Sequence, residues 1–183
     1  MSMPGQRFTY ADYCLLPEDK RYELVEGDLL LTPAPSVRHQ MIVAALLARI
    51  YLFADSQGLG RVLTAPTDVI LSDENVVQPD LLFVSASRLG IMQPHGGVHG
   101  APDLAIEILS PSNPARDQVL KRKLYGKYGV REYWIVDPQG QTVEVLTRTE
   151  GGLQTWQVFP MSTSLESPLL PGFTVRVSDL FRD

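Results

Sequence analysis

A short apolar stretch that contains one carboxylate constrains the fold of this chain more than any other segment. Residues 103–109 read Asp-Leu-Ala-Ile-Glu-Ile-Leu, with the period of two that is typical of a β-strand. Apolar residues on both faces indicate a strand covered from both sides. Glu107 would then lie inside the protein, where an ionised carboxylate needs a cation, strong hydrogen-bond donors or a metal ion. The alternative is a glutamate at the edge of a sheet that reaches solvent or an arginine.

A basic helix is predicted to follow this strand, from an N-cap at Asn113 to a stop at Gly129. At about 100° per residue, the apolar side chains of this helix form one arc, and Lys121 falls within it. Lys121 is therefore the basic residue whose amine we expect to point inward, toward Glu107. The alternative is a surface pair between Asp117 and Lys121, four residues apart, which would contribute roughly 0.3 kcal/mol.

A second carboxylate stands at the start of another apolar run. Residues 76–84 read Val-Val-Gln-Pro-Asp-Leu-Leu-Phe-Val, and Pro79 indicates that regular strand pairing begins only after it or that it marks a bulge. Asp103 also follows a proline, but it lies about 13 Å along the strand from Glu107. That separation is too long for a shared ion with ligand bonds of about 2.1 Å. Asp80, on a different strand, is free to meet Glu107.

The remaining segments predict a mixed α/β fold. Residues 21–31 indicate a hairpin around a Glu-Gly-Asp turn, and Ser36 can cap a long apolar helix that ends near Gly58. The segment 90–102, rich in Gly and Pro, is expected to be a mobile loop beside a cleft, and residues 167–173 to pack as an extended lid. We therefore expect a central mixed sheet flanked by helices, with an N-terminal hairpin and a C-terminal β extension.

Several polar residues in these elements have simple structural explanations. Glu23 alternates with apolar neighbours in the first strand of the hairpin, which is compatible with a solvated position. His39 falls in the first turn of the long helix, where a capping or structural imidazole is more usual than a catalytic one. His95 and His99 lie in the predicted loop and have no other candidate ligand close by in the sequence.

Composition limits the classes of protein to be considered. The 183 residues, 44% of them hydrophobic, can form a substantial core, and we expect a single domain over residues 1–183. Cys14 is the one cysteine, which excludes an internal disulfide and fits the cytoplasm. We find no signal segment and no apolar run near the ~20 residues that span a bilayer, so no membrane association is expected.

Charge leaves the partner open. The formal net charge of -5 argues against a generic basic nucleic-acid binder. Residues 116–131 carry mostly positive charges, however, so a local basic patch is compatible with the sequence.

Asp80, Glu107 and an inward Lys121 form a pattern that is typical of a metal site. Two carboxylates supply the hard oxygen ligands that Mg²⁺ and Mn²⁺ prefer. A neighbouring amine can hold or deprotonate a water molecule. The sequence therefore predicts a hydrolytic metal centre at these residues.

Seven short segments, taken as a set, carry a resemblance to a known family. They are residues 21–27, 36–40, 77–81, 107–112, 117–125, 129–138 and 167–173. In these segments the chain resembles the Uma-two-type family of the PD-(D/E)XK restriction-endonuclease-like superfamily, over nearly its whole length. In the first segment, Glu23 is similar to an acidic residue that some superfamily members use as an extra ligand or base.

The resemblance implies a restriction-endonuclease-like core with a divalent metal ion, Mg²⁺ or Mn²⁺. Asp80, Glu107 and the main-chain carbonyl of Ile108 would be its ligands. The chain departs from the superfamily pattern at Leu109, where a lysine is expected. Lys121 in the following helix matches the position to which that lysine is moved in the family.

Two functional hypotheses follow. The first is a metal-dependent nuclease that cuts nucleic acid, with DNA as the expected substrate and a homodimer suited to cutting two strands. The second is a non-catalytic homo-oligomeric binding or scaffold protein that keeps the fold. The net charge of -5 and the missing lysine after Glu107 favour this second hypothesis.

Overall fold

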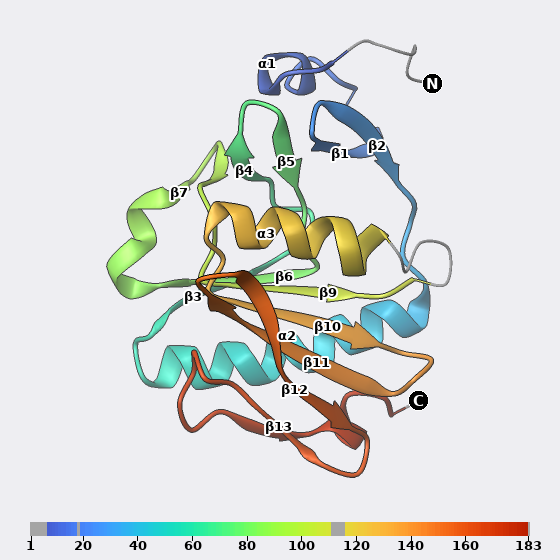
Figure 1. The fold of residues 1–183 in the computed structure, drawn as a ribbon, viewed down its shortest axis with the longest axis vertical. Helices are drawn as coiled ribbons and strands as arrows, with labels where there is room; N and C mark the ends of the chain where they lie inside the picture. Colours follow the sequence, from blue (N-terminus) through green and yellow to red (C-terminus); the bar gives the residue numbers. More distant parts are fainter. Residues whose placement is uncertain (1–6, 18, 111–115, 183) are drawn as a thin grey trace.

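The computed structural model describes residues 7–17, 19–110 and 116–182 (Figure 1). Its strands are β1 (Arg21–Val25), β2 (Asp28–Thr32), β3 (Gly60–Thr64), β4 (Val69–Ser72), β5 (Asn75–Val77), β6 (Leu81–Ser85), β7 (Met92–Gln93), β8 (Gly97–His99), β9 (Leu104–Ile108), β10 (Glu132–Asp137), β11 (Thr142–Thr149), β12 (Gly152–Pro160), β13 (Ser164–Glu166) and β14 (Thr174–Arg176). Its helices are α1 (Tyr10–Tyr13), α2 (Val37–Ser56) and α3 (Arg122–Tyr128), with the 3₁₀ turns η1 (Ala86–Ile91) and η3 (Val177–Asp179) and the π-helical turn η2 (Arg116–Lys121).

The predicted mixed α/β class is confirmed, but the strands form two large sheets instead of one central sheet. The core sheet has the order β12-β11-β10-β9-β6-β3, and the second sheet has the order β2-β1-β5-β4-β8-β7. In the core sheet β9 and β10 run parallel and the other neighbours run antiparallel. The hairpin β1–β2 enters the second sheet because β1 also pairs with β5, a contact between distant segments.

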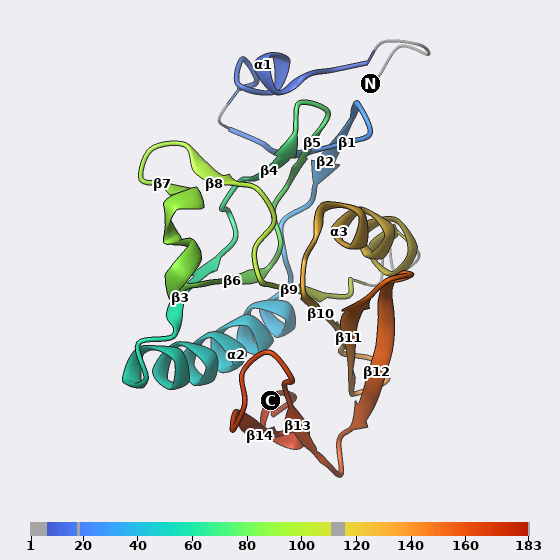
Figure 2. The ribbon, with the colours of Figure 1, turned by 60° about the vertical axis from the view of Figure 1, so that its left-hand side comes forward.

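Helices cover opposite faces of the core sheet, so that β9 is enclosed (Figure 2). All five residues of β9 are buried. Leu104, Ile106 and Ile108 belong to the cluster on the α2 side, whereas Ala105 belongs to the cluster on the α3 side. Since strand side chains alternate between faces, Glu107 faces α3. The prediction that the strand is covered from both sides is confirmed.

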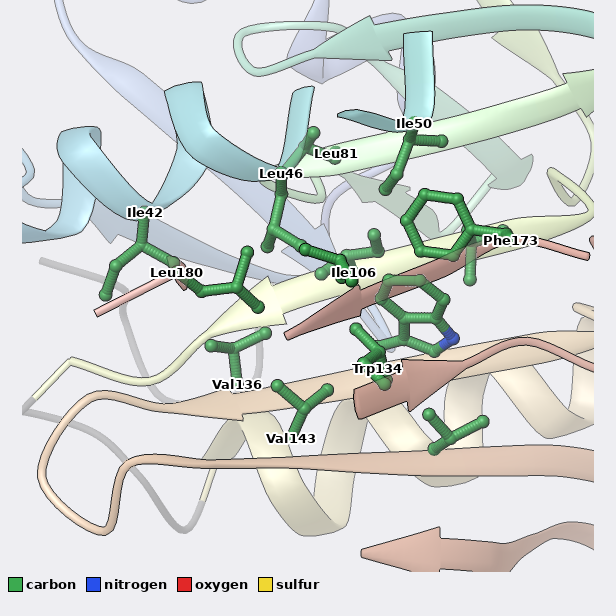
Figure 3. Close-up of a cluster of buried hydrophobic side chains, with 14 of the residues drawn as sticks. Ile42, Leu46, Ile50, Leu81, Ile106, Trp134, Val136, Val143, Phe173 and Leu180 are labelled. Atoms are coloured by element: carbon green, nitrogen blue, oxygen red, sulfur yellow. The ribbon is translucent and has the colours of Figure 1, made fainter. Parts of the chain in front are cut away.

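Helix α2 begins at Ser36, whose side chain accepts a hydrogen bond from the N–H of His39. By length and composition alone this 20-residue helix is apolar enough to cross a membrane, although no apolar run of that length is expected from the sequence. One stripe of α2 nevertheless packs into the core: Ile42, Leu46 and Ile50 face Ile106, Trp134, Val136 and Val143 of the sheet (Figure 3). This packing is that of a core helix covering a sheet.

The C-terminal extension is part of the core and not only a lid. Phe173 packs against the ring of Trp134 and against α2 residue Phe53. Buried Glu132 accepts hydrogen bonds from the Ser167 hydroxyl at 2.6 Å and the Leu169 N–H at 2.8 Å. Burial raises the pKa of Glu132, although these donors oppose that effect. The carboxylate therefore ties the extension to β10.

Three local predictions have different outcomes in the structure. The segment 90–102, predicted to be a loop, contains the short antiparallel pair β7–β8, so that prediction was wrong in part. The predicted helix start at Asn113 lies outside the described residues. The predicted stop at Gly129 is confirmed, because Gly129 adopts φ 96° at the end of α3, a left-handed conformation that favours glycine.

Asp103 is a buried structural carboxylate at the start of β9. It accepts a hydrogen bond from the Ser85 N–H at 2.8 Å and pairs with Arg88 at 2.9 Å and Arg131 at 3.4 Å. Burial alone would raise the pKa of Asp103, but the Ser85 N–H and the Arg88 guanidinium outweigh burial and lower it. Asp103 therefore fixes the β6–β9 connection and lies apart from Glu107.

We expect Asp103→Asn to lower the free energy of unfolding by about 2 kcal/mol at pH 7, because Arg88 loses its buried partner. The lowered pKa gives wild type a contribution that is present above about pH 4 and is lost as the pH falls through the pKa of folded Asp103. The difference between the two proteins should therefore shrink in acid. Urea unfolding at several pH values measures it, and the exposed Asp28→Asn is the control. A difference that grows in acid would contradict this account.

Candidate active site

A cleft of about 840 Å³ opens where the second sheet meets the core sheet. Its walls come from the hairpin β1–β2, the N-terminal end of α2, the C-terminal end of β9 and the junction of η2 with α3. In Figure 1 these ends lie on the same side of the molecule. All four sequence-predicted side chains, Glu23, Asp80, Glu107 and Lys121, line this cleft.

Lys121 lies between two buried carboxylates. Its Nζ is 2.7 Å from Glu107 Oε1 and 3.0 Å from Glu23 Oε1, and about 5% of its side chain is exposed. The Tyr125 hydroxyl donates to Glu107 Oε1 at 2.7 Å, and the Gln78 N–H donates to Glu23 Oε1 at 2.9 Å. Glu23 is thus buried and paired, and the interpretation of Glu23 as a solvated strand residue was wrong.

The π-helical turn and α3 place Lys121 and Tyr125 on the inward face of one helical segment. Lys121 ends η2, and Tyr125 follows it four residues later in α3. Residues four apart lie on the same face of a helix, so both side chains reach Glu107. Burial, and then the charge of Glu107, raises the pKa of Tyr125 well above its usual value. Tyr125 is therefore a neutral hydrogen-bond donor to the carboxylate at ordinary pH.

The register of β6 and β9 brings Asp80 beside Glu107. Leu81 is paired with Ile106 in this antiparallel ladder, so the next two residues outward are Asp80 and Glu107. Side chains directly opposite in an antiparallel pair lie on the same face, about 5 Å apart at Cβ. Asp80 Oδ2 also accepts a hydrogen bond from the Ile108 N–H at 2.7 Å. Strand pairing thus places both carboxylates at the mouth of the cleft.

His39 is a site residue that the sequence did not identify. Its Nε2 lies 3.1 Å from Asp80 Oδ2, across 41 positions of chain. Its Nδ1 is buried and has no hydrogen-bond partner within the described part of the chain. The first turn of α2, fixed by the Ser36 cap, aims the imidazole at Asp80. The sequence signal that could have identified His39 is its place in segment 36–40, which carries part of the family resemblance. Its contact with Asp80 cannot be inferred from neighbouring residues.

The donor set fits a hard divalent cation. Asp80 and Glu107 supply carboxylate oxygens, and Ile108, which follows Glu107 and whose N–H binds Asp80, supplies a main-chain carbonyl. Across the described ranges, no group of three or more His, Cys, Asp and Glu side chains is arranged to hold an ion by itself. A site here would thus depend on two carboxylates and the main chain.

The charge balance of the cleft also favours a cation. Its charged side chains are the acidic Glu23, Asp80, Glu107 and Asp137 and the basic Arg21, Arg38 and Lys121. With Lys121 already paired with two of the carboxylates, an anionic substrate would meet a site without excess positive charge. A bound divalent cation would reverse that balance.

Comparisons with known proteins identify the family and the fold. A family model described as "Putative restriction endonuclease" matches residues 9–178. The chain is also similar to a solved structure described as "a putative nuclease belonging to DUF820 from Anabaena variabilis", with 24% identity, a TM-score of 0.80, and coverage of 95% of this chain and 97% of the other. At this identity the solved structure shows the shared restriction-endonuclease-like fold. No curated protein sequence matches the chain.

We expect Lys121→Met to lower the free energy of unfolding by about 3 kcal/mol, because it leaves Glu23 and Glu107 without the ammonium between them. Lys123→Met is the matched control, because Lys123 is exposed two residues further along the same helix. The control should change stability by less than about 0.5 kcal/mol. Chemical denaturation of both variants without added metal measures the difference, and equal effects would show that the buried ion pairs contribute little.

Proposed function

Because the chain belongs to the "Putative restriction endonuclease" family, we propose that it is a metal-dependent nuclease that hydrolyses phosphodiester bonds in DNA. The observation that supports this proposal most strongly is the convergence of Asp80, Glu107 and Lys121 in one cleft. Structural ion pairs alone do not explain it, because strand register, a helix cap and a π-helical turn all direct polar groups to the same place.

In this proposal Asp80, Glu107 and the carbonyl of Ile108 hold Mg²⁺ or Mn²⁺. The bound cation would polarise the phosphodiester and lower the pKa of the attacking water. His39 is a positioning residue in this scheme, since it contacts Asp80 and fixes the orientation of that carboxylate. The Ile108 N–H donates a hydrogen bond to the same oxygen that His39 contacts, Asp80 Oδ2.

Lys121 is proposed to hold the attacking water and to stabilise negative charge at the reacting phosphate. Its ammonium is already positioned by Glu23 and Glu107, so little reorganisation is needed when substrate arrives. The Tyr125 hydroxyl donates to the same oxygen of Glu107, Oε1, that Lys121 contacts. Glu23 therefore serves as the residue that positions the lysine, and it lies close enough to the cleft to accept a proton from the water.

The test of the metal site is Mn²⁺ binding by titration calorimetry. Wild type should bind Mn²⁺, and Asp80→Asn and Glu107→Gln should each weaken binding by at least about tenfold, because each removes a charged oxygen ligand. Asp103→Asn, which alters a carboxylate outside the cleft, should bind like wild type. Binding that survives in both site variants would place the ion elsewhere and overturn the assignment.

Hydrolysis is tested separately. Wild type with Mn²⁺ or Mg²⁺ should cleave plasmid and linear DNA, and Asp80→Asn should lose at least about a hundredfold in rate under the same conditions. Cleavage of both strands would fit a homodimer with two active sites. Analytical sedimentation measures the oligomeric state. Unchanged cleavage by Asp80→Asn would exclude the proposed centre. Mn²⁺ binding without cleavage of DNA or RNA would favour the non-catalytic scaffold.

A further inference from the structure

A basic surface lies on the outer side of the same helix that carries Lys121. Three of the four lysines in the chain fall between residues 121 and 127. Lys121 is buried in the cleft, whereas Lys123 and Lys127 are exposed. Positions 121 and 123 are about 200° apart around a helix, and positions 123 and 127 are about 40° apart. The two exposed lysines therefore share the face opposite the active site.

This outer surface is hollowed by a second cleft of about 650 Å³, between α3 and the turn that joins β11 to β12. The Arg122 Nε donates to the Leu153 carbonyl at 3.1 Å, which fixes the helix to β12. A Cβ on Gly126 would stand 3.2 Å from the Leu153 backbone nitrogen, so glycine permits this close approach. The floor of the cleft is thus set by packed backbone, with Lys123 and Lys127 along one side.

The charge of this surface contrasts with that of the whole chain. Arg122, Lys123 and Lys127 line the cleft, and the guanidinium of exposed Arg148 lies at the end of α3, where a Cβ on Gly129 would stand 3.0 Å from its Nη1. The neighbouring β11–β12 turn adds one acidic side chain, Glu150. A chain with net charge -5 thus has three cations along this cleft and a fourth at the end of the same short helix.

We propose that this surface, formed by the outer face of α3, the β11–β12 turn and Arg148, binds the phosphate backbone of duplex DNA beside the bond that is cut. The inference deepens the proposed function and rests on it for the identity of the polyanion. Lys123 and Lys127 stand about 6 Å apart along the helix axis, so they present repeated positive charge to a repeated anion. Lysines that contact phosphates supply affinity without reading sequence.

The helix separates this surface from the cleft that holds Lys121. An α-helix is about 10 Å across with its side chains, so one phosphate does not contact both faces. DNA must pass beside α3 with the reacting phosphate at the cleft and neighbouring phosphates at Lys123 and Lys127. Loss of these lysines should therefore weaken binding and leave the rate of the bound complex unchanged.

The test is the affinity of wild type and of the double variant K123Q/K127Q for a fluorescent DNA duplex, measured by anisotropy at several salt concentrations without divalent metal. The double variant should bind about tenfold more weakly at low salt, and the slope of log K against log salt should fall by about two. The control K20Q/R61Q removes two exposed cations elsewhere, and it should match wild type.

Three results would overturn the proposal that this surface binds duplex DNA. They are a double variant with wild-type affinity and slope, a wild type that does not bind duplex, and a wild type that binds phosphatidylserine vesicles in preference to duplex. The nuclease proposal fails in a different way: wild type would bind duplex DNA but would not bind Mn²⁺ or would not cleave the DNA. If wild type cleaves DNA, its single-turnover rate at saturating DNA should equal that of K123Q/K127Q. A slower double variant would contradict a role in affinity alone, because the lysines would then affect the chemical step.

Discussion

The position of the Lys121 ammonium between Glu23 and Glu107 is the interaction on which the site depends. It joins β1 of the second sheet, β9 of the core sheet and the helical segment that begins with η2. Buried charges of this kind are tolerated only when each has its partners, so the three elements must be assembled together. Because an unpaired Lys121 ammonium would be costly to bury, its two ion pairs hold the two sheets together at the cleft.

Strand register supplies the rest of the geometry at short range. Leu81 pairs with Ile106, and Asp80 and Glu107 are the next residues beyond that pair. Strand β6 begins at Leu81, two residues after Pro79. The Ile108 N–H then fixes Asp80 from the same strand that carries Glu107. The pairing of β6 with β9 therefore sets both carboxylates and the carbonyl of Ile108, which follows Glu107, and this is the rigid support that an ion site requires.

The sequence predicted features that depend on local periodicity and, with the family resemblance, the four side chains Glu23, Asp80, Glu107 and Lys121 that line the cleft. It did not predict the other features that depend on distant pairing. The enclosed strand around Glu107, the hairpin and the stop at Gly129 follow from patterns a few residues long. The second sheet was missed because β1 pairs with β5 some fifty positions away. The contact of His39 with Asp80 has the same origin, since it spans 41 positions. A polar residue at a helix start gives no local sign of its partner.

In the proposed function, the inner side of the helical segment η2–α3 contributes to catalysis, and its outer side contributes to the affinity for DNA. On the inner side, Lys121 at the end of η2 lines a cleft with more acidic than basic groups, and Tyr125 of α3 donates to Glu107. The outer face of α3 carries exposed Lys123 and Lys127. A net charge of -5 repels polyanions at long range, while local cations attract them at short range and low salt. An ion in the cleft would lower that repulsion where the phosphodiester must approach. The outer lysines should therefore set the affinity for DNA, whereas loading of the metal site should set whether the bound phosphodiester can be cut.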